Sequence, residues 1–198
     1  MVINNAPLNW RSLSHHGRYK RLQKVRRVYC RNYSARQEDL SGRTVHLDGA
    51  WINDVPSFHL SMGEAVNGLH GYFGGCLDSL ADCLCGGFGV KHPLTIRLTH
   101  SSKVRDALDG RAWCRFRAES FQEAIDGGSD IAELMDWGYF DDDSEAEVQR
   151  RTAIYKAALA NEAFDCEEFH SYFDVILEVF AHGGIKLVLE NEEPEDES

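Results

Sequence analysis

The sequence predicts an α/β protein in which helices pack over a small, three-stranded parallel sheet. Segments with the apolar pattern of strands occur three times along the 198 residues, and segments with helical spacing lie between them. Strands that are joined through helices form parallel sheets with right-handed crossovers. The hydrophobic fraction of 43% and the charged fraction of 27% are typical of a globular protein.

The first elements have clear start and stop signals. Residues 44–47 form a short strand that ends at an Asp-Gly turn signal. A helix is then expected over residues 54–66, with Asp54 or Ser57 as its cap and Pro56 in its first turn. An Asn-Gly pair ends this helix.

The later elements follow from the same rules. Leu and Ile alternate with polar residues over residues 94–99, which predicts a strand. The run from Ser144 to Glu147 fits a capping box, whereas the pattern between residues 109 and 144 is loose. The remaining elements are expected as helices at residues 101–108, 144–159 and 167–181 and as a strand at residues 185–189.

Charge divides the chain. Residues 1–43 form a basic N-terminal extension, because residues 1–36 contain nine Lys or Arg and no acid. Residues 37–198 contain 12 basic residues against 32 acidic ones, a balance of −20, and the acidic tail at residues 191–198 is expected to be disordered. A body of this charge favours encounter with basic proteins.

The basic extension allows three interpretations. It is a poorly ordered or surface-lying arm, since its apolar positions are sparse. Alternatively, residues 11–36 bind nucleic acid, as basic blocks with interleaved aromatics do. The third interpretation is that the start is assigned too early and the arm is not made.

The central helix is the strongest functional signal. A helix is expected over residues 76–85, bracketed on both sides by glycines and aromatics. Asp78 and Asp82 lie four residues apart and therefore share one face, with no Lys or Arg nearby to pair with them. The opposite face is apolar and carries Leu77, Leu80 and Leu84. Such a helix suits docking against a cationic surface.

Catalytic and metal-binding chemistry is not expected. The sequence lacks a P-loop, a G-x-S-x-G, an H-E-x-x-H and a dinucleotide-binding G-x-G-x-x-G. Asp78 and Asp82 lie along one helix, whereas an acid/base pair usually faces across a cleft. Cys83 is interpreted as a core residue, His59 as a helix-face or capping residue, and the six cysteines as thiols without metal spacing. We therefore expect no cofactor and no metal.

No membrane or secretion signal is present. The sequence has no apolar run of 18 residues and no apolar signal-peptide stretch. We therefore expect a cytoplasmic protein.

The central motif resembles a known family. Residues 72–84, YFGGCLDSLADCL, resemble the Y-Y-G-x-N-L-D-A-L-x-D-C-L core of barstar, the bacterial intracellular inhibitor of ribonucleases. The resemblance extends over residues 44–108 and 166–189. It implies a barstar-like domain at residues 44–190, with a helical insertion at residues 109–165.

The resemblance also implies a function and a site. Barstar-like proteins are not enzymes but plug a ribonuclease active site with the acidic helix, so the implied partner is a basic ribonuclease or nuclease toxin bound one-to-one. The resemblance implies that Tyr72 is an aromatic contact and that Gly74 allows a close approach. It implies that Asp78 and Asp82 are the carboxylates that replace substrate phosphates. Glu178 would be a further acid, and Phe88 would replace the family's tryptophan. Cys76 and Ala81 depart from the family pattern, so contacts or packing differ there.

Overall fold

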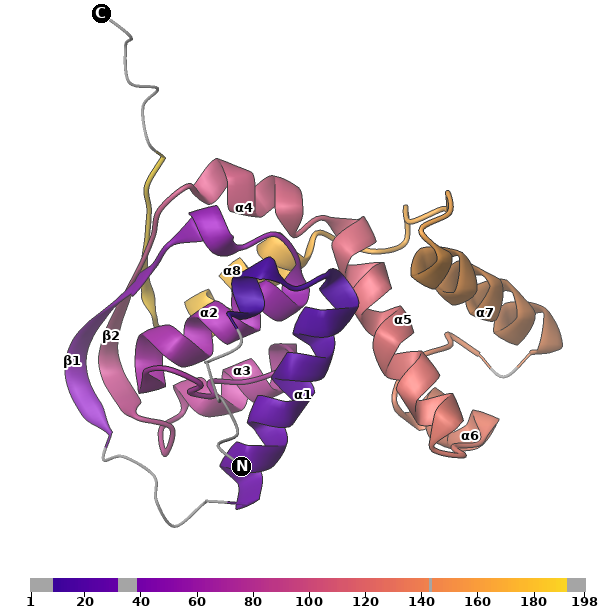
Figure 1. The fold of residues 1–198 in the computed structure, drawn as a ribbon, viewed down its shortest axis with the longest axis horizontal. Coiled ribbons are helices and arrows are strands. Elements are labelled where there is room, and N and C mark those ends of the chain that lie inside the picture. Colours follow the sequence, from indigo (N-terminus) through magenta and orange to yellow (C-terminus); the bar gives the residue numbers. More distant parts are fainter. Residues whose placement is uncertain (1–8, 32–38, 143, 192–198) are drawn as a thin grey trace, which may run out of the picture. The chain divides into compact units, whose positions relative to one another are not determined.

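The computed structural model describes residues 9–31, 39–142 and 144–191. It divides the chain into two compact units (Figure 1). Unit 1 comprises Met1–Ala107 and Phe173–Ser198, and unit 2 comprises Leu108–Tyr172.

Unit 1 contains the predicted three-stranded parallel sheet. The strands are β1 (Leu40–Leu47), β2 (Val90–Leu98) and β3 (Lys186–Leu189), and β2 lies in the centre. Thr95 and Ile96 of β2 pair with β1 and with β3. The predicted fold class is therefore confirmed, although β1 and β2 both start four residues earlier than expected.

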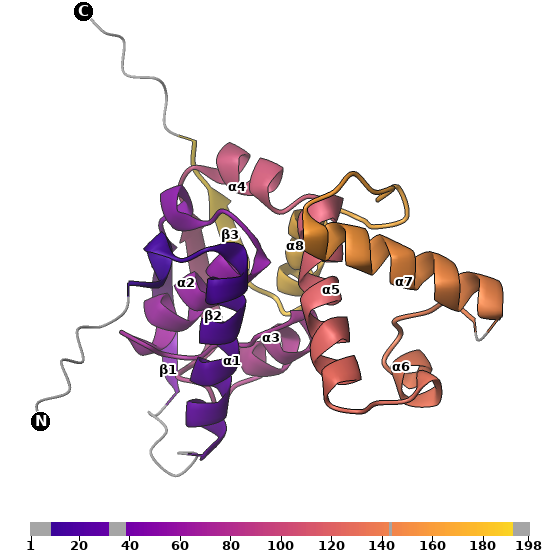
Figure 2. The same cartoon turned by 45° about the vertical axis from the view of Figure 1, so that its right-hand side comes forward.

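The sheet buries one face only. Val45 of β1 and Ile96 of β2 are both buried, while Thr44 and His46 on the other face of β1 are exposed. Alternation of this kind is typical of a sheet with one covered and one open face. Figures 1 and 2 show the helices of unit 1 gathered on one side of the strands. They are α1 (His15–Arg31), α2 (Val55–Asn67), α3 (Leu77–Leu84), α4 (Ser101–Ala107) and α8 (Tyr172–His182), with short 3₁₀ turns η1 (Trp10–Ser12) and η3 (Gly49–Trp51).

Helix α2 begins as its sequence predicts. The Asp54 carboxylate accepts a hydrogen bond from the Ser57 backbone N–H at 2.9 Å, and the Ser57 hydroxyl accepts one from the Asp54 N–H at 2.9 Å. This reciprocal pair is a capping box, so both predicted cap residues act together. Pro56 lies in the first turn, where its missing N–H costs nothing.

The N-terminal segment corrects an expectation. Residues 9–31 are not a poorly ordered arm, because α1 packs against α2 and buries Tyr19, Leu22 and Val25. These residues are spaced three apart, so they form a narrow stripe that is hard to recognise among so many charges. Trp10, which precedes the helix, is 2% exposed.

Unit 2 is helical. It contains α5 (Gly110–Asp126), α6 (Ile131–Asp136) and α7 (Glu145–Ala160) around an aromatic core. Ser144 caps α7 as predicted, accepting a hydrogen bond from the Glu147 N–H at 3.3 Å. The Glu147 carboxylate instead pairs with Arg150 at 2.8 Å, so only half of the predicted capping box forms.

Helix α8 begins later than predicted. It starts at Tyr172 rather than at residue 167. The Glu167 N–H is bound by the Asp165 carboxylate at 3.0 Å, a local hydrogen bond that competes with a helical turn.

Candidate functional site

Helix α3 presents its two predicted faces. Leu80, Cys83 and Leu84 are buried, at 2% exposure or less. Asp78 and Asp82 lie on the exposed side of the helix. Among the described residues neither carboxylate has an ion-pair partner within the chain. This surface is therefore anionic and accessible.

The N-terminus of α3 is fastened by a serine. The Ser79 hydroxyl accepts hydrogen bonds from the backbone N–H groups of Gly75, at 2.7 Å, and Cys76, at 3.0 Å. Donors that would otherwise lack partners are satisfied in this way. Asp78, in the first turn, also lies where the helix dipole favours a negative charge.

Gly74 brings the preceding loop against α3. Its φ is +79°, and a Cβ at this position would lie 2.7 Å from the backbone N and Cα of Leu80. Only glycine fits both restrictions. The close approach that the resemblance implies at Gly74 is therefore a contact within the chain.

Two polar side chains hold the loops on both sides of α3. The Asn67 amide donates to the carbonyl oxygens of Tyr72, at 2.7 Å, and Phe88, at 3.0 Å, and so bridges the two loops. The Asp39 carboxylate accepts hydrogen bonds from the backbone N–H groups of Gly87 and Gly89. The Gly87 hydrogen bond lowers the pKa of Asp39, so this carboxylate stays charged at neutral pH.

His59 of α2 binds the backbone of Gly74, in the loop that precedes α3. It is 1% exposed, and burial lowers its pKa to about 3, although a backbone hydrogen bond with Gly74 opposes the shift. The ring is therefore neutral at physiological pH. A buried neutral histidine bound to a loop backbone acts in positioning.

Glu178 lies near α3, across a groove. This groove has a volume of about 350 Å³ and runs between α3 and α8. Glu178 is exposed and lines it together with Ala81 of α3, the neighbour of Asp82. The other lining residues are Leu84, Cys85, Val175, Val179, His182 and Gly183. The structure thus places Glu178 in a groove that is also lined by Ala81, whereas Asp78 and Asp82 do not line it.

The two aromatic residues predicted for the site are placed differently. Tyr72 is only 6% exposed, and its ring lies 5.0 Å from the ring of Tyr29 in α1. Phe88 stacks on the same Tyr29 ring at 5.7 Å. Burial raises the pKa of Tyr72. The Tyr72 side chain, which the resemblance implies as a partner contact, is therefore covered in this structure.

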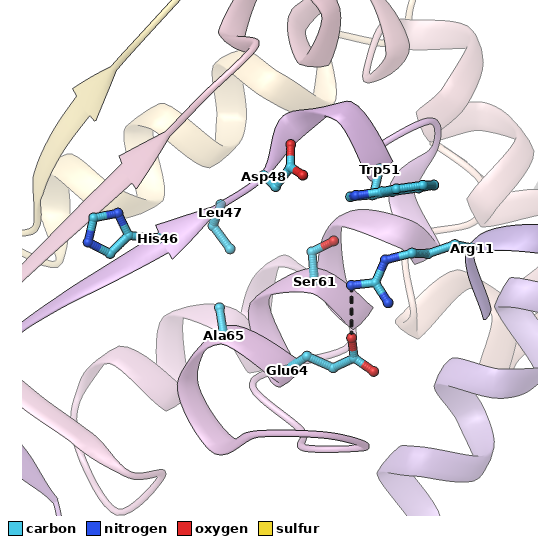
Figure 3. Close-up of a pocket in the computed structure, with 8 residues that line it drawn as sticks. All are labelled: Arg11, His46, Leu47, Asp48, Trp51, Ser61, Glu64 and Ala65. Atoms are coloured by element: carbon cyan, nitrogen blue, oxygen red, sulfur yellow. Dashed lines mark hydrogen bonds and ion pairs between the residues drawn. The ribbon is translucent and has the colours of Figure 1, made fainter. Parts of the chain in front are cut away.

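A second pocket lies outside this surface. Figure 3 shows it between η1, the end of β1 and α2, with a volume of about 240 Å³. Arg11 is stacked over Trp51 at 5.5 Å and pairs with Glu64 at 3.3 Å. Its cation and an acid thus neutralise each other, which leaves little attraction for a charged ligand.

The described residues contain no group of three His, Cys, Asp or Glu side chains that could hold a metal ion. Within the same part of the chain, no helix has the length and apolar character that a membrane crossing requires.

Part of the chain that includes α3 matches a known protein family. Residues 42–126 match the family model described as barstar (barnase inhibitor). This part of the chain is therefore similar to the barstar family. No curated protein and no solved structure matches the chain.

The match covers part of the observed fold. It begins within β1, includes α2, α3 and β2, and ends at the last residue of α5. It therefore extends into the expected insertion at residues 109–165. The third strand, β3, and α8 lie beyond it, yet both take part in unit 1.

Several residues that hold α3 and its flanking loops in place were not predicted to do so. Asn67 was expected only to end a helix, and no role was assigned to Asp39, Ser79 or Tyr29. Asn67, Asp39 and Tyr29 act on backbone groups or rings that folding brings close, whereas Ser79 binds the backbone of Gly75 and Cys76 nearby in the sequence. The helix-breaking Asn67-Gly68 pair was the only signal among them.

Proposed function

We propose that this protein is an inhibitor of a basic ribonuclease, or an immunity protein against a ribonuclease-type toxin. It would bind one-to-one in the cytoplasm and block the active site with α3. The observation that carries the proposal is the pair of exposed carboxylates, Asp78 and Asp82, on a helix whose two ends are held by the fold. The similarity to the barstar family supports it.

The chemistry of a nuclease explains why carboxylates suit this role. A nuclease surrounds the phosphate of its substrate with Arg, Lys and His, so its empty site is a cationic pocket. Carboxylates on a fixed helix can occupy that pocket and cannot be cleaved. Because the loops around α3 are held by Asn67 and Asp39, little ordering is needed on binding.

The neighbouring acid extends the same surface. Glu178 lines the groove beside α3 and is the further acid that the resemblance implies. We take residues 109–165 to be an insertion that influences the choice of partner.

Nucleic-acid binding through residues 11–36 is the alternative function. Lys20, Lys24, Arg27 and Arg31 are spaced along one exposed side of α1, as that alternative requires.

The proposal is tested by Asp82→Ala. We expect the variant to bind the nuclease more weakly by about 2–5 kcal/mol, the cost of truncating one member of a buried charge pair, a range taken in part from the barnase–barstar complex itself. Inhibition of RNA cleavage is titrated with barnase and with any nuclease that the wild-type chain retains in a pull-down eluted by rising salt.

Asp106→Ala is the matched control, because Asp106 is an exposed aspartate on another helix of unit 1. It should inhibit as the wild type does. Equal inhibition by wild type and Asp82→Ala would show that the acidic face of α3 is not the inhibitory surface.

A further inference from the structure

The last turns of α1 cover the aromatic residues beside the acidic helix. The Tyr29 ring lies between Tyr72, at 5.0 Å with a 36° tilt, and Phe88, at 5.7 Å with a 19° tilt. One aromatic ring of the chain therefore occupies the end of the surface where a cationic partner would bind.

Helix α1 is held unevenly along its length. Its first half is anchored firmly, because Tyr19 and Leu22 are each 1% exposed and Arg18 pairs with the buried Asp54 at 2.6 Å. Its last turns are exposed: Val28 is 49% exposed, and its charged neighbours lie on the surface. In that part Tyr29 makes the ring contacts with unit 1. Helix ends with few buried contacts open locally while the rest stays folded.

We propose that the last two turns of α1 are a built-in cap on the inhibitory surface, and that Tyr29 must leave Tyr72 and Phe88 before a partner can use them. This rests on the proposed function. The anchored first half keeps the cap attached when its end unwinds, so the cap is displaced without loss of the fold. The displacing group would be a planar side chain, since it must replace the Tyr29 ring beside Tyr72 and Phe88.

The first test needs no partner. Amide hydrogen exchange of the full chain is measured in α1 by NMR. We expect residues 28–31 to exchange at least about 100-fold faster than residues 19–25, because the end opens locally whereas the first half opens with the fold. Equal rates for the two parts, with the denaturant dependence of global unfolding, would overturn the cap.

The second test uses barnase as the probe nuclease. The association rate constant is measured by stopped flow for wild type, Tyr29→Ala and Tyr29→Leu, which keeps apolar volume but cannot stack. Both variants should associate about tenfold faster than wild type. Cys30→Ala, an exposed neighbour in the same turn, should not change the rate.

The two proposals fail in different ways. An unchanged or slower rate for both Tyr29 variants would overturn the cap while leaving inhibition intact. Absence of barnase binding by every form counts against the proposed function, and the exchange rates then decide the cap on their own.

Discussion

Gly74 shows how strongly single residues of the loops determine the position of the acidic helix α3. It combines a positive φ with a backbone contact to Leu80, the first buried residue of α3. Within the described residues, by contrast, the carboxylates of Asp78 and Asp82 have no ion-pair partner. The residues that fix the surface and the residues that carry its charge are therefore different ones.

Gly74→Ala should lower the free energy of unfolding by about 3 kcal/mol, because left-handed backbone strain and a steric clash act together. Gly42→Ala is the matched control: Gly42 has a φ of +73°, but a Cβ there would meet nothing within 4 Å. It should cost about 1 kcal/mol, from strain alone. Urea unfolding measures both, and equal losses would contradict the contact with Leu80.

Residues with local signatures were predictable at this scale, and residues with distant partners were not. Asp78 and Asp82 stand out through their spacing, and Asp54 through its position before a helix. Asn67 binds Phe88 from 21 positions away, and Asp39 binds Gly89 from 50 positions away. Such pairs leave no pattern in a single sequence. Tyr29 belongs to the same class, which is why the burial of Tyr72 was not foreseen.

Among the elements, α1 is fastened to the start of α2 by one buried carboxylate, that of Asp54. Arg18 and His15 both bind Asp54, at 2.6 Å and 2.9 Å, and Asp54 is 6% exposed. Burial alone would raise the pKa of Asp54, but the hydrogen bonds from His15 and Arg18 outweigh it and hold the pKa well below its usual range. One side chain thus caps α2 and anchors α1.

Asp54→Asn should lower the free energy of unfolding at pH 7 by about 3 kcal/mol, the lower end of the range for breaking a buried ion pair, because Arg18 stays 13% exposed. Asparagine still caps α2, so the loss reports the charge. Since the folded pKa is depressed, the advantage of the wild type is fully present above the ordinary value of 3.8 and shrinks as pH falls below it.

Chemical unfolding between pH 7 and pH 2 measures this difference, with Asp106→Asn as the exposed control. A difference that is constant over the whole range would mean that the Asp54 charge does not anchor α1.

Elements with strong periodicity or caps were predicted well. Helices α2, α3 and α7 were found where expected, and the three strands were found with β1 and β2 starting four residues early, because their apolar spacing or cap residues are local. Helix α5 was missed: its 17 residues contain three arginines and large aromatics, and Asp109 at its cap was not recognised. The narrow stripe of α1 was missed for a similar reason.

At the scale of the whole molecule, charge is the dominant property. The chain has a net charge of −11, although its first 36 residues contribute nine positive charges. The acidic remainder sets a negative long-range field, which would favour encounter with a basic protein.

Association with a basic nuclease should therefore slow at least about tenfold when ionic strength rises from about 0.01 M to 0.5 M, because the Debye length falls from about 30 Å to a few Å. The dissociation rate should change much less. Stopped-flow measurement with barnase checks both, and an association rate that does not depend on salt would contradict electrostatic steering.

The bridge made by Asn67 has a consequence for how such a protein changes over time. Because one amide at the end of α2 ties together the loops before and after α3, the backbone of this stretch is set from outside it. Substitutions at the exposed positions 78, 81 and 82 therefore leave the hydrogen bonds of this bridge in place. We expect the exposed face of the acidic helix to tolerate mutation for this reason, so that the face can diverge while the fold is kept.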